Sequence, residues 1–236
     1  LPKEYWHTHD PFVGLAAAAA VTTNLKVGTG IALVTERDPI LMAKQVATLD
    51  HISNGRLILG VGAGWNAEEM ENHGTPFASR WKVLRERILA MKAIWTDEAA
   101  EFHGDYVDFD PLWSYPKPKQ AGGPPILLGA ASKYMHKRIA EYCDGWFPIY
   151  QDEARAAAAG ATDYSESMRL TREAWDSAGR SGSPNSTIFG VGHDPAAVER
   201  CLAHGFDRIV FALPPAGADE VLPMIERYAA LKKQFD

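Results

Sequence analysis

The stretch LILGVGAGW, residues Leu57–Trp65, decides the fold prediction. Its residues 57–62 are predicted to form a strand, and their continuous apolar character is typical of a strand that is covered on both faces of a parallel sheet. Its second half, Gly60-x-Gly62-x-Gly64, forms a turn before a short acidic helix at Asn66–Asn72. Glycines in such a turn permit positive φ and a close approach of the backbone to a ligand. Because the spacing differs from the GxGxxG dinucleotide motif, the turn alone supports ligand binding and tight packing equally.

Strand-like and helix-like segments alternate on both sides of this stretch. The other predicted strands cover residues 25–34, 126–129, 145–149, 186–191 and 207–213. The other predicted helices cover residues 38–52, 79–95, 132–142, 163–178, 194–204 and 219–235. The alternation predicts an α/β fold with a parallel sheet. Six strands fit either an open doubly wound sheet or most of a closed barrel.

Local signals mark where the predicted elements begin and end. Asp38 before Pro39 predicts a capped helix start, and Gly55 predicts a left-handed turn at that helix's end. Ser132, at the expected N-cap of the helix after Gly129-Ala130-Ala131, is explained equally well by phosphate binding and by simple capping. The aromatic and proline-rich segment 102–119 predicts an inserted hairpin that turns at Gly104-Asp105.

Composition and charge limit the class of protein. The chain has 236 residues, 46% of them apolar, and a formal net charge of −6. These values predict one globular domain over residues 1–236, with no nucleic-acid or membrane partner. No apolar run approaches the roughly 20 residues of a membrane span, so we expect a cytoplasmic protein. Cys143 and Cys201 are expected to be buried and reduced.

Three glycine-rich or small-residue segments are candidates for ligand contact. Beside the turn at residues 60–65, Gly28 and Gly30 lie within a strand, where a bend or a close ligand explains them. The run Gly129-Ala130-Ala131 at a strand end suits either phosphate binding or simple packing.

The titratable residues form no recognisable catalytic set. His7-x-His9 has no third ligand at metal spacing, so no metal is expected. Glu68, Glu69 and Glu71 are typical of favourable charges in a first helical turn. An enzyme with so few acid–base groups is expected to depend on a cofactor.

Several motifs taken together resemble one family, the luciferase-like flavin oxidoreductases, and most of all its branch that uses coenzyme F420. The resemblance covers essentially the whole chain and is carried by Asp38-Pro39, Ala43-Lys44-Gln45, Thr48-Leu49-Asp50, Ser53-x-Gly55-Arg56 and Gly60-x-Gly62-x-Gly64-Trp65. It implies a (β/α)8 TIM-type barrel. The six predicted strands then imply a barrel that lacks its first two N-terminal strands and carries a small insertion near residues 100–122.

The resemblance also implies where a cofactor lies. Gly30, Ile31 and Ala32 match a bulge that backs the flavin or deazaflavin ring, often through a cis peptide, for which Gly30-Ile31 is the expected place. Ala63 and Gly64 match positions beside the ring and its ribityl chain. The cofactor phosphate is expected at Gly129, Ala130 and Ala131, although relatives often have a second glycine where this chain has alanine. Trp65, Trp113 and Phe147 fit either the pocket or the core.

The activity implied by the resemblance is hydride transfer between F420 and a small organic substrate. The alternatives are an FMN-dependent monooxygenase and a non-catalytic barrel that binds a flavin or another ligand. Relatives are commonly homodimers, so a homodimer is expected. No catalytic side chain is assigned from the sequence.

Overall fold

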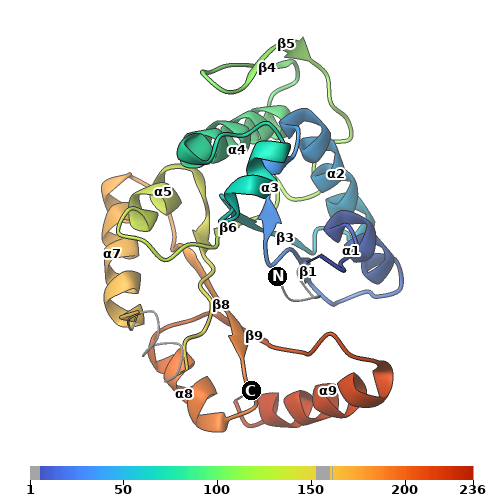
Figure 1. Ribbon diagram of the computed structural model, residues 1–236, viewed down its shortest axis with the longest axis vertical. Coiled ribbons are helices and arrows are strands. Elements are labelled where there is room, and N and C mark those ends of the chain that lie inside the picture. Colours follow the sequence, from blue (N-terminus) through green and yellow to red (C-terminus); the bar gives the residue numbers. More distant parts are fainter. Residues whose placement is uncertain (1–5, 153–159, 161, 236) are drawn as a thin grey trace. The chain divides into compact units, whose positions relative to one another are not determined.

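The computed structural model describes residues 6–152, 160 and 162–235. The chain divides into two compact units, one of residues 9–126 and one of residues 127–236 together with residues 1–8. The strand β6, Ile126–Leu128, carries the chain from the first unit into the second (Figure 1).

The sheet of the first unit is built on one fully buried strand. Both β1 (Val27–Gly28) and β2 (Ala32–Leu33) pair in parallel with β3 (Leu57–Gly62). The predicted single strand 25–34 is therefore two short pieces on the same partner, separated by residues 29–31. β3 itself has the predicted bounds, and the continuous apolar run explains why it is covered on both faces.

Four helices surround this sheet: α1 (Pro11–Ala20), α2 (Pro39–Ile52), α3 (Ala67–Asn72) and α4 (Arg80–Thr96), with 3-10 turns at Val34–Glu36 and Phe77–Ser79. The carboxylate of Asp38 accepts a hydrogen bond from Leu41 N at 2.8 Å, which confirms the predicted cap of α2. Helices α2 and α4 pack side by side (Figure 1). Their contact includes a hydrogen bond from Trp95 Nε1 to Ala43 O at 3.1 Å.

The turn between α2 and β3 is fixed by an arginine. Asn54 and Gly55 both adopt positive φ, 54° and 79°, as the left-handed turn requires. The Arg56 guanidinium then donates hydrogen bonds to Ala19 O at 2.8 Å and to Thr22 O at 2.9 Å. Arg56 thereby joins the end of α1 to the start of β3.

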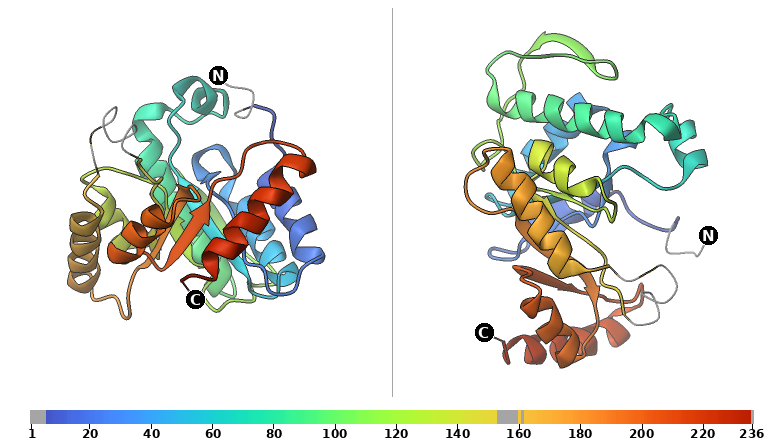
Figure 2. Two further views of the ribbon diagram at one scale, coloured as in Figure 1. Left: turned by 90° about the horizontal axis from the view of Figure 1, so that it is seen from below. Right: turned by 90° about the vertical axis from the view of Figure 1, so that its left-hand side faces the viewer.

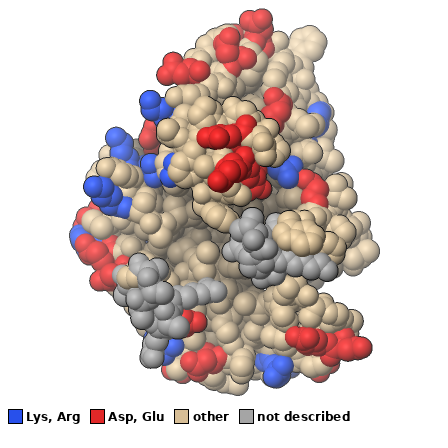
Figure 3. Space-filling view, viewed as in Figure 1, with Lys and Arg blue, Asp and Glu red and all other residues tan. Residues whose placement is uncertain are grey.

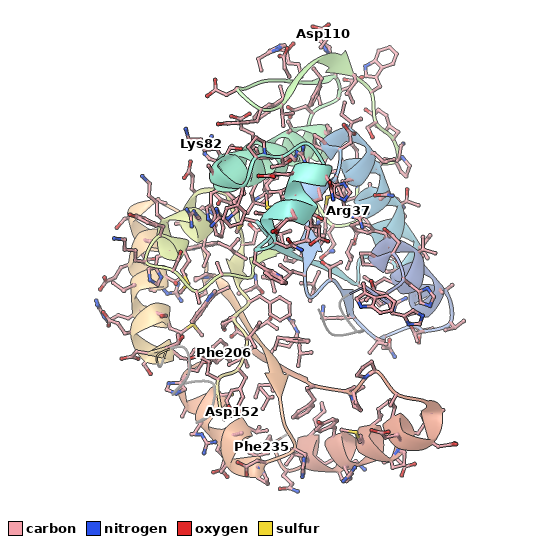
Figure 4. The ribbon with its side chains drawn as sticks, in the orientation of Figure 1. Arg37, Lys82, Asp110, Asp152, Phe206 and Phe235 are labelled. Atoms are coloured by element: carbon pink, nitrogen blue, oxygen red, sulfur yellow. The ribbon has the colours of Figure 1, made fainter. Side chains whose placement is uncertain are left out.

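The predicted insertion is a two-stranded antiparallel hairpin. It consists of β4 (Ala100–His103) and β5 (Asp108–Leu112), and its turn covers residues 104–107. The hairpin carries acidic side chains, visible at the upper edge of Figure 3, and Asp110 is labelled there in Figure 4.

The second unit repeats the parallel strand–helix pattern. β6, β7 (Gly145–Trp146), β8 (Asn185–Val191) and β9 (Arg208–Phe211) pair in that order, all in parallel. Its helices are α5 (Met135–Tyr142), α7 (Tyr164–Ser177), α8 (Pro195–Ala203) and α9 (Ala218–Lys232). Figure 2 shows α5 and α7 side by side. The parallel pairings confirm the predicted α/β class.

The prediction that Ser132 caps α5 is wrong. The helix begins at Met135, and its N-cap residue is Tyr134, whose side chain makes no capping bond. Ser132 instead starts a turn, because its main-chain O accepts a hydrogen bond from Met135 N at 3.0 Å. Cys143 and Cys201 are buried thiols, as predicted. Among the residues that the structure describes, no helix is long and apolar enough to span a membrane.

Candidate functional site

The gap between β1 and β2 exposes the residues that the resemblance assigned to the ring. The peptide bond between Gly30 and Ile31 is cis, as predicted. Gly30 is exposed and Ile31 is 38% exposed, although a large apolar side chain usually lies in the core. Ala32 returns to the interior, with 2% of its surface exposed. The pairing with β3 is therefore interrupted at the point where the chain exposes the apolar side chain of Ile31.

The glycine-rich turn lies at the end of the neighbouring strand β3. Ala63 is 3% exposed and Gly64 has a φ of 81°. A Cβ atom on Gly64 would lie 2.9 Å from Met70 Sδ on α3, so this glycine has a packing requirement of its own. Trp65, next in the chain, is 63% exposed. The turn thus combines tight packing at Gly64 with an exposed aromatic surface.

Three buried threonines connect these two segments. Thr29 Oγ1 donates a hydrogen bond to Gly60 O at 2.6 Å, and Thr35 Oγ1 donates to Ala63 O at 3.2 Å. Thr75 Oγ1 donates in turn to Thr35 O at 2.7 Å. Sequence reasoning missed all three, because a threonine in a β-rich segment usually reflects strand propensity. Only the position of Thr29 between two glycines was a signal.

A carboxyl group that sequence reasoning did not single out lies under the turn. Glu36 Oε1 is buried, has no hydrogen-bond partner among the described residues, and would lie 3.7 Å from a Cβ on Gly64. Burial raises the pKa of Glu36, and the charge of Glu69 raises it further, against the opposing effects of His73 and Arg37. This environment favours the neutral acid.

The acidic residues of α3 and Asp10 have structural roles. Asn66 Oδ1 accepts a hydrogen bond from Glu69 N at 3.4 Å, so it caps α3 and places Glu68 and Glu69 in the first turn. Figure 3 shows acidic side chains gathered over α3. Arg37, labelled in Figure 4, forms an ion pair of 2.8 Å with Asp10.

The predicted phosphate residues follow β6 in the second unit. Ala130 O accepts a hydrogen bond from Trp146 Nε1 at 2.8 Å, and Trp146 is fully buried. Gly129 and Ala130 are half-buried, whereas Ala131 is exposed. In the same unit Phe147 is half-buried and meets Phe189 edge-to-face, with ring centroids 6.1 Å apart.

Two other candidates lie elsewhere. Trp113 directly follows the hairpin strand β5 and is 80% exposed. His7 and His9 are both exposed. Within residues 6–152, 160 and 162–235, no three His, Cys, Asp or Glu side chains are placed to hold a metal ion.

The residues between β1 and β2 and those that follow β3 fit the ring of a flavin or deazaflavin in their chemistry. Neither segment 28–35 nor segment 60–65 contains a charged side chain. These two uncharged segments, here called the wall, each expose an apolar side chain, Ile31 and Trp65. Such a composition suits a flat aromatic ring, because cofactor sites are mostly apolar with few polar contacts.

Comparison with known proteins identifies the family of the chain. The sequence pattern of the luciferase-like monooxygenases matches residues 2–193. The chain belongs to this family. An uncharacterized protein, Rv0953c, of Mycobacterium tuberculosis is 39% identical over 231 residues, which cover 98% of this chain and 79% of that protein. The FMNH2-dependent dimethylsulfone monooxygenase of Pseudomonas putida is 35% identical over 134 residues, or 56% of this chain and 37% of that enzyme.

A solved structure shows the same fold. The coenzyme F420-dependent tetrahydromethanopterin reductase of Methanopyrus kandleri matches with a TM-score of 0.74 at 18% identity, over 92% of this chain and 88% of that one. This likeness identifies the fold as the TIM-barrel type of the luciferase-like proteins, in place of the open doubly wound sheet.

Proposed function

We propose that this member of the family binds coenzyme F420 and transfers a hydride between the deazaflavin and a small organic substrate. The observation that carries the proposal is the uncharged wall formed by segments 28–35 and 60–65, with the exposed Ile31 between β1 and β2. The choice of F420 rests on the resemblance of residues 25–65 to the F420-dependent branch. The F420-dependent reductase is 18% identical, so its likeness supports the fold of this chain and not its cofactor.

The roles of the residues follow from their chemistry. When bound, F420 supplies the hydride chemistry at C5 of its ring. Gly30, Ile31 and Ala32 would back one face of the ring, and Ala63 and Gly64 would lie beside it. Gly129, Ala130 and Ala131 are proposed to hold the phosphate. The protein would orient the ring and keep water from it, because the cofactor itself carries the reaction.

A second candidate is an FMN-dependent monooxygenase. The relative that favours it is the FMNH2-dependent enzyme, which is 35% identical over 134 residues. A third is a ligand-binding barrel without activity, which the alanines at residues 130 and 131 favour, because they give the backbone less room than glycines.

Fluorescence titration of the purified protein with F420 and with oxidised FMN separates the candidates. We expect both the quenching and the affinity to be greater for F420. Equal or tighter binding of FMN would overturn the choice of F420. Binding of F420 without turnover over a broad panel of substrates would favour the third candidate.

A charge on the wall tests the position of the site. Ile31→Glu should weaken cofactor binding at least tenfold, because a carboxylate would be desolvated against the ring. Ile52→Glu is the matched control, since Ile52 is 47% exposed at the end of α2. Equal affinities in the two variants would place the cofactor elsewhere. We also propose a homodimer, and light scattering of the protein at working concentration tests it.

A further inference from the structure

The three buried threonines of the first unit stand out because a buried hydroxyl is costly unless it is bonded. Thr29, Thr35 and Thr75 are 4%, 0% and 2% exposed. Each donates to a main-chain carbonyl at least 28 positions away in the sequence, so none of the bonds is a local helix or turn contact. Thr29 and Thr35 follow the carboxyl ends of β1 and β2, the end at which parallel barrels carry their sites, and Thr75 follows α3.

Thr29 occupies the gap in the strand ladder. Main-chain pairing joins residues 27–28 to 57–58 and resumes where residues 32–33 meet 61–62. Between them the hydroxyl of Thr29 donates to Gly60 O at 2.6 Å. This side-chain bond joins the first residue of the bulge to β3, beside the main-chain bond from Thr29 N to Ile58 O at 3.4 Å.

Thr35 holds the turn 60–65 at Ala63. Its hydroxyl donates to Ala63 O, and its own main-chain O accepts from Thr75 Oγ1 at 2.7 Å. Thr75 N also donates to Met70 O at 3.0 Å, so the chain of bonds reaches the end of α3. Thr29 therefore holds the carbonyl of Gly60, and Thr35 holds the carbonyl of Ala63.

We propose that Thr29 and Thr35 are positioning residues, whose hydroxyls set the conformation of the turn 60–65 against the bulge 29–31. They act through the main chain of the wall and do not themselves bond the reacting atoms. Their effect on cofactor affinity rests on the function proposed above. Their effect on the turn does not, and it can be measured without any ligand.

The first measurement is amide hydrogen exchange of residues 60–65 in the protein without added cofactor. Thr29→Val and Thr35→Val replace the hydroxyl by a methyl group of similar size, whereas Thr29→Ser and Thr35→Ser keep the hydroxyl. Loss of one buried hydrogen bond corresponds to about a threefold to tenfold change in a local equilibrium. We expect exchange in the turn to quicken by about that factor in the valine variants and to return to within twofold in the serine variants.

The matched control is Thr171→Val. Thr171 is 2% exposed, and its hydroxyl also donates to a main-chain carbonyl, Ser167 O, at 2.7 Å, but it lies on α7 in the other unit. This variant should lose global stability without faster exchange in residues 60–65. Should Thr35→Val fail to fold, Thr75→Val removes the next bond of the same chain and decides the matter.

The second measurement is the affinity and the absorption spectrum of bound F420 or FMN. The valine variants of Thr29 and Thr35 should bind about threefold to tenfold more weakly and shift the spectrum, with recovery in the serine variants. Unchanged exchange and unchanged affinity in both valine variants would overturn the positioning role. If the wild-type protein binds neither cofactor, the proposed function fails, while the exchange of residues 60–65 still decides the role of the threonines.

Discussion

The two carboxylate oxygens of Asp50 each accept a hydrogen bond from Gln120, one from its main-chain N and one from its Nε2, both at 2.8 Å. Asp50 lies fully buried near the end of α2. Gln120 Nε2 also donates to Leu57 O at 2.9 Å. The pair therefore joins α2, the first residue of β3 and the end of the inserted segment.

Removing the amide tests how much this junction contributes. Gln120→Ala takes away the donor to one oxygen of a buried carboxylate and should lower the free energy of unfolding by about 2–3 kcal/mol. Urea denaturation measures it. Lys119→Ala is the control, because Lys119 is exposed beside Gln120, and it should change stability by less than about 0.5 kcal/mol. Equal effects of the two variants would show that the bonds to Asp50 contribute little.

A second buried carboxylate holds the inserted hairpin. Glu86 on α4 is 9% exposed and accepts hydrogen bonds from the main-chain N atoms of Asp105, Tyr106 and Val107 at 3.2, 2.6 and 3.0 Å. Glu86→Ala leaves all three donors without this partner and should destabilise the protein by about 2–3 kcal/mol. Limited proteolysis should then cut first within residues 104–107.

The control for Glu86 lies on the hairpin itself. Glu101→Ala removes an exposed carboxylate from β4. It should leave both the unfolding midpoint and the proteolysis pattern unchanged. Protection of the turn in Glu86→Ala equal to that of the wild type would contradict the role of Glu86.

A histidine between two helices of the second unit makes stability depend on pH. Burial lowers the pKa of His136 below its ordinary 6.5, against the opposing charge of Glu166. His136 Nδ1 lies 2.9 Å from Thr171 Oγ1, so α5 meets α7 at this pair. Because the folded state takes up the proton less readily than the unfolded chain, the stabilising contribution is complete above the ordinary pKa. It is lost as the pH falls towards the lower folded pKa.

Thermal unfolding at several pH values checks this expectation. Between about pH 7 and about pH 5 the Tm of the wild type should fall more than that of His136→Gln, which has no titrating ring at this position. His193→Gln alters an exposed histidine and should follow the wild type. Parallel curves for His136→Gln and the wild type would contradict the assignment.

The sequence could predict those parts of the fold that periodicity and local residue chemistry determine. The apolar run of β3 and the Asp38 cap are read directly from residue types, and the structure has both. The cis peptide at Gly30-Ile31 came from the family resemblance, because no local pattern marks a cis bond away from proline.

The remaining features depend on contacts between distant residues. In the break between β1 and β2, the Thr29 hydroxyl bonds to the carbonyl of Gly60, which lies 31 residues later in the chain. Helix α5 starts late because the chain first forms a turn after β6. In this turn the main-chain O of Ser132, and not its hydroxyl, accepts the hydrogen bond from Met135 N. Glu36 Oε1 lies 3.7 Å from the Cβ position of Gly64, a residue far from it in the sequence. A sequence read segment by segment does not contain these distances.

Two separate reasons explain the glycine at position 64. One is its positive φ, and the other is the lack of space for a Cβ beside Met70. Gly64→Ala adds a Cβ at a φ of 81°, and places it 2.9 Å from the Sδ of Met70, which is fully buried and has little room to move. Gly74→Ala adds a Cβ at a φ of 76° with no atom within 4 Å, so it carries the backbone cost alone. That cost is about 1–2 kcal/mol.

Gly64→Ala should therefore be more destabilising than Gly74→Ala, by about 1–2 kcal/mol for the overlap in a packed interior. Met70→Ala removes the overlapping atom and alone should cost about 2–4 kcal/mol. Since the two residues are in contact, the double variant should lose at least about 0.5 kcal/mol less than the sum of the single variants. Additive losses in urea denaturation would mean that the turn at Gly64 yields to the new methyl group without pressing on α3.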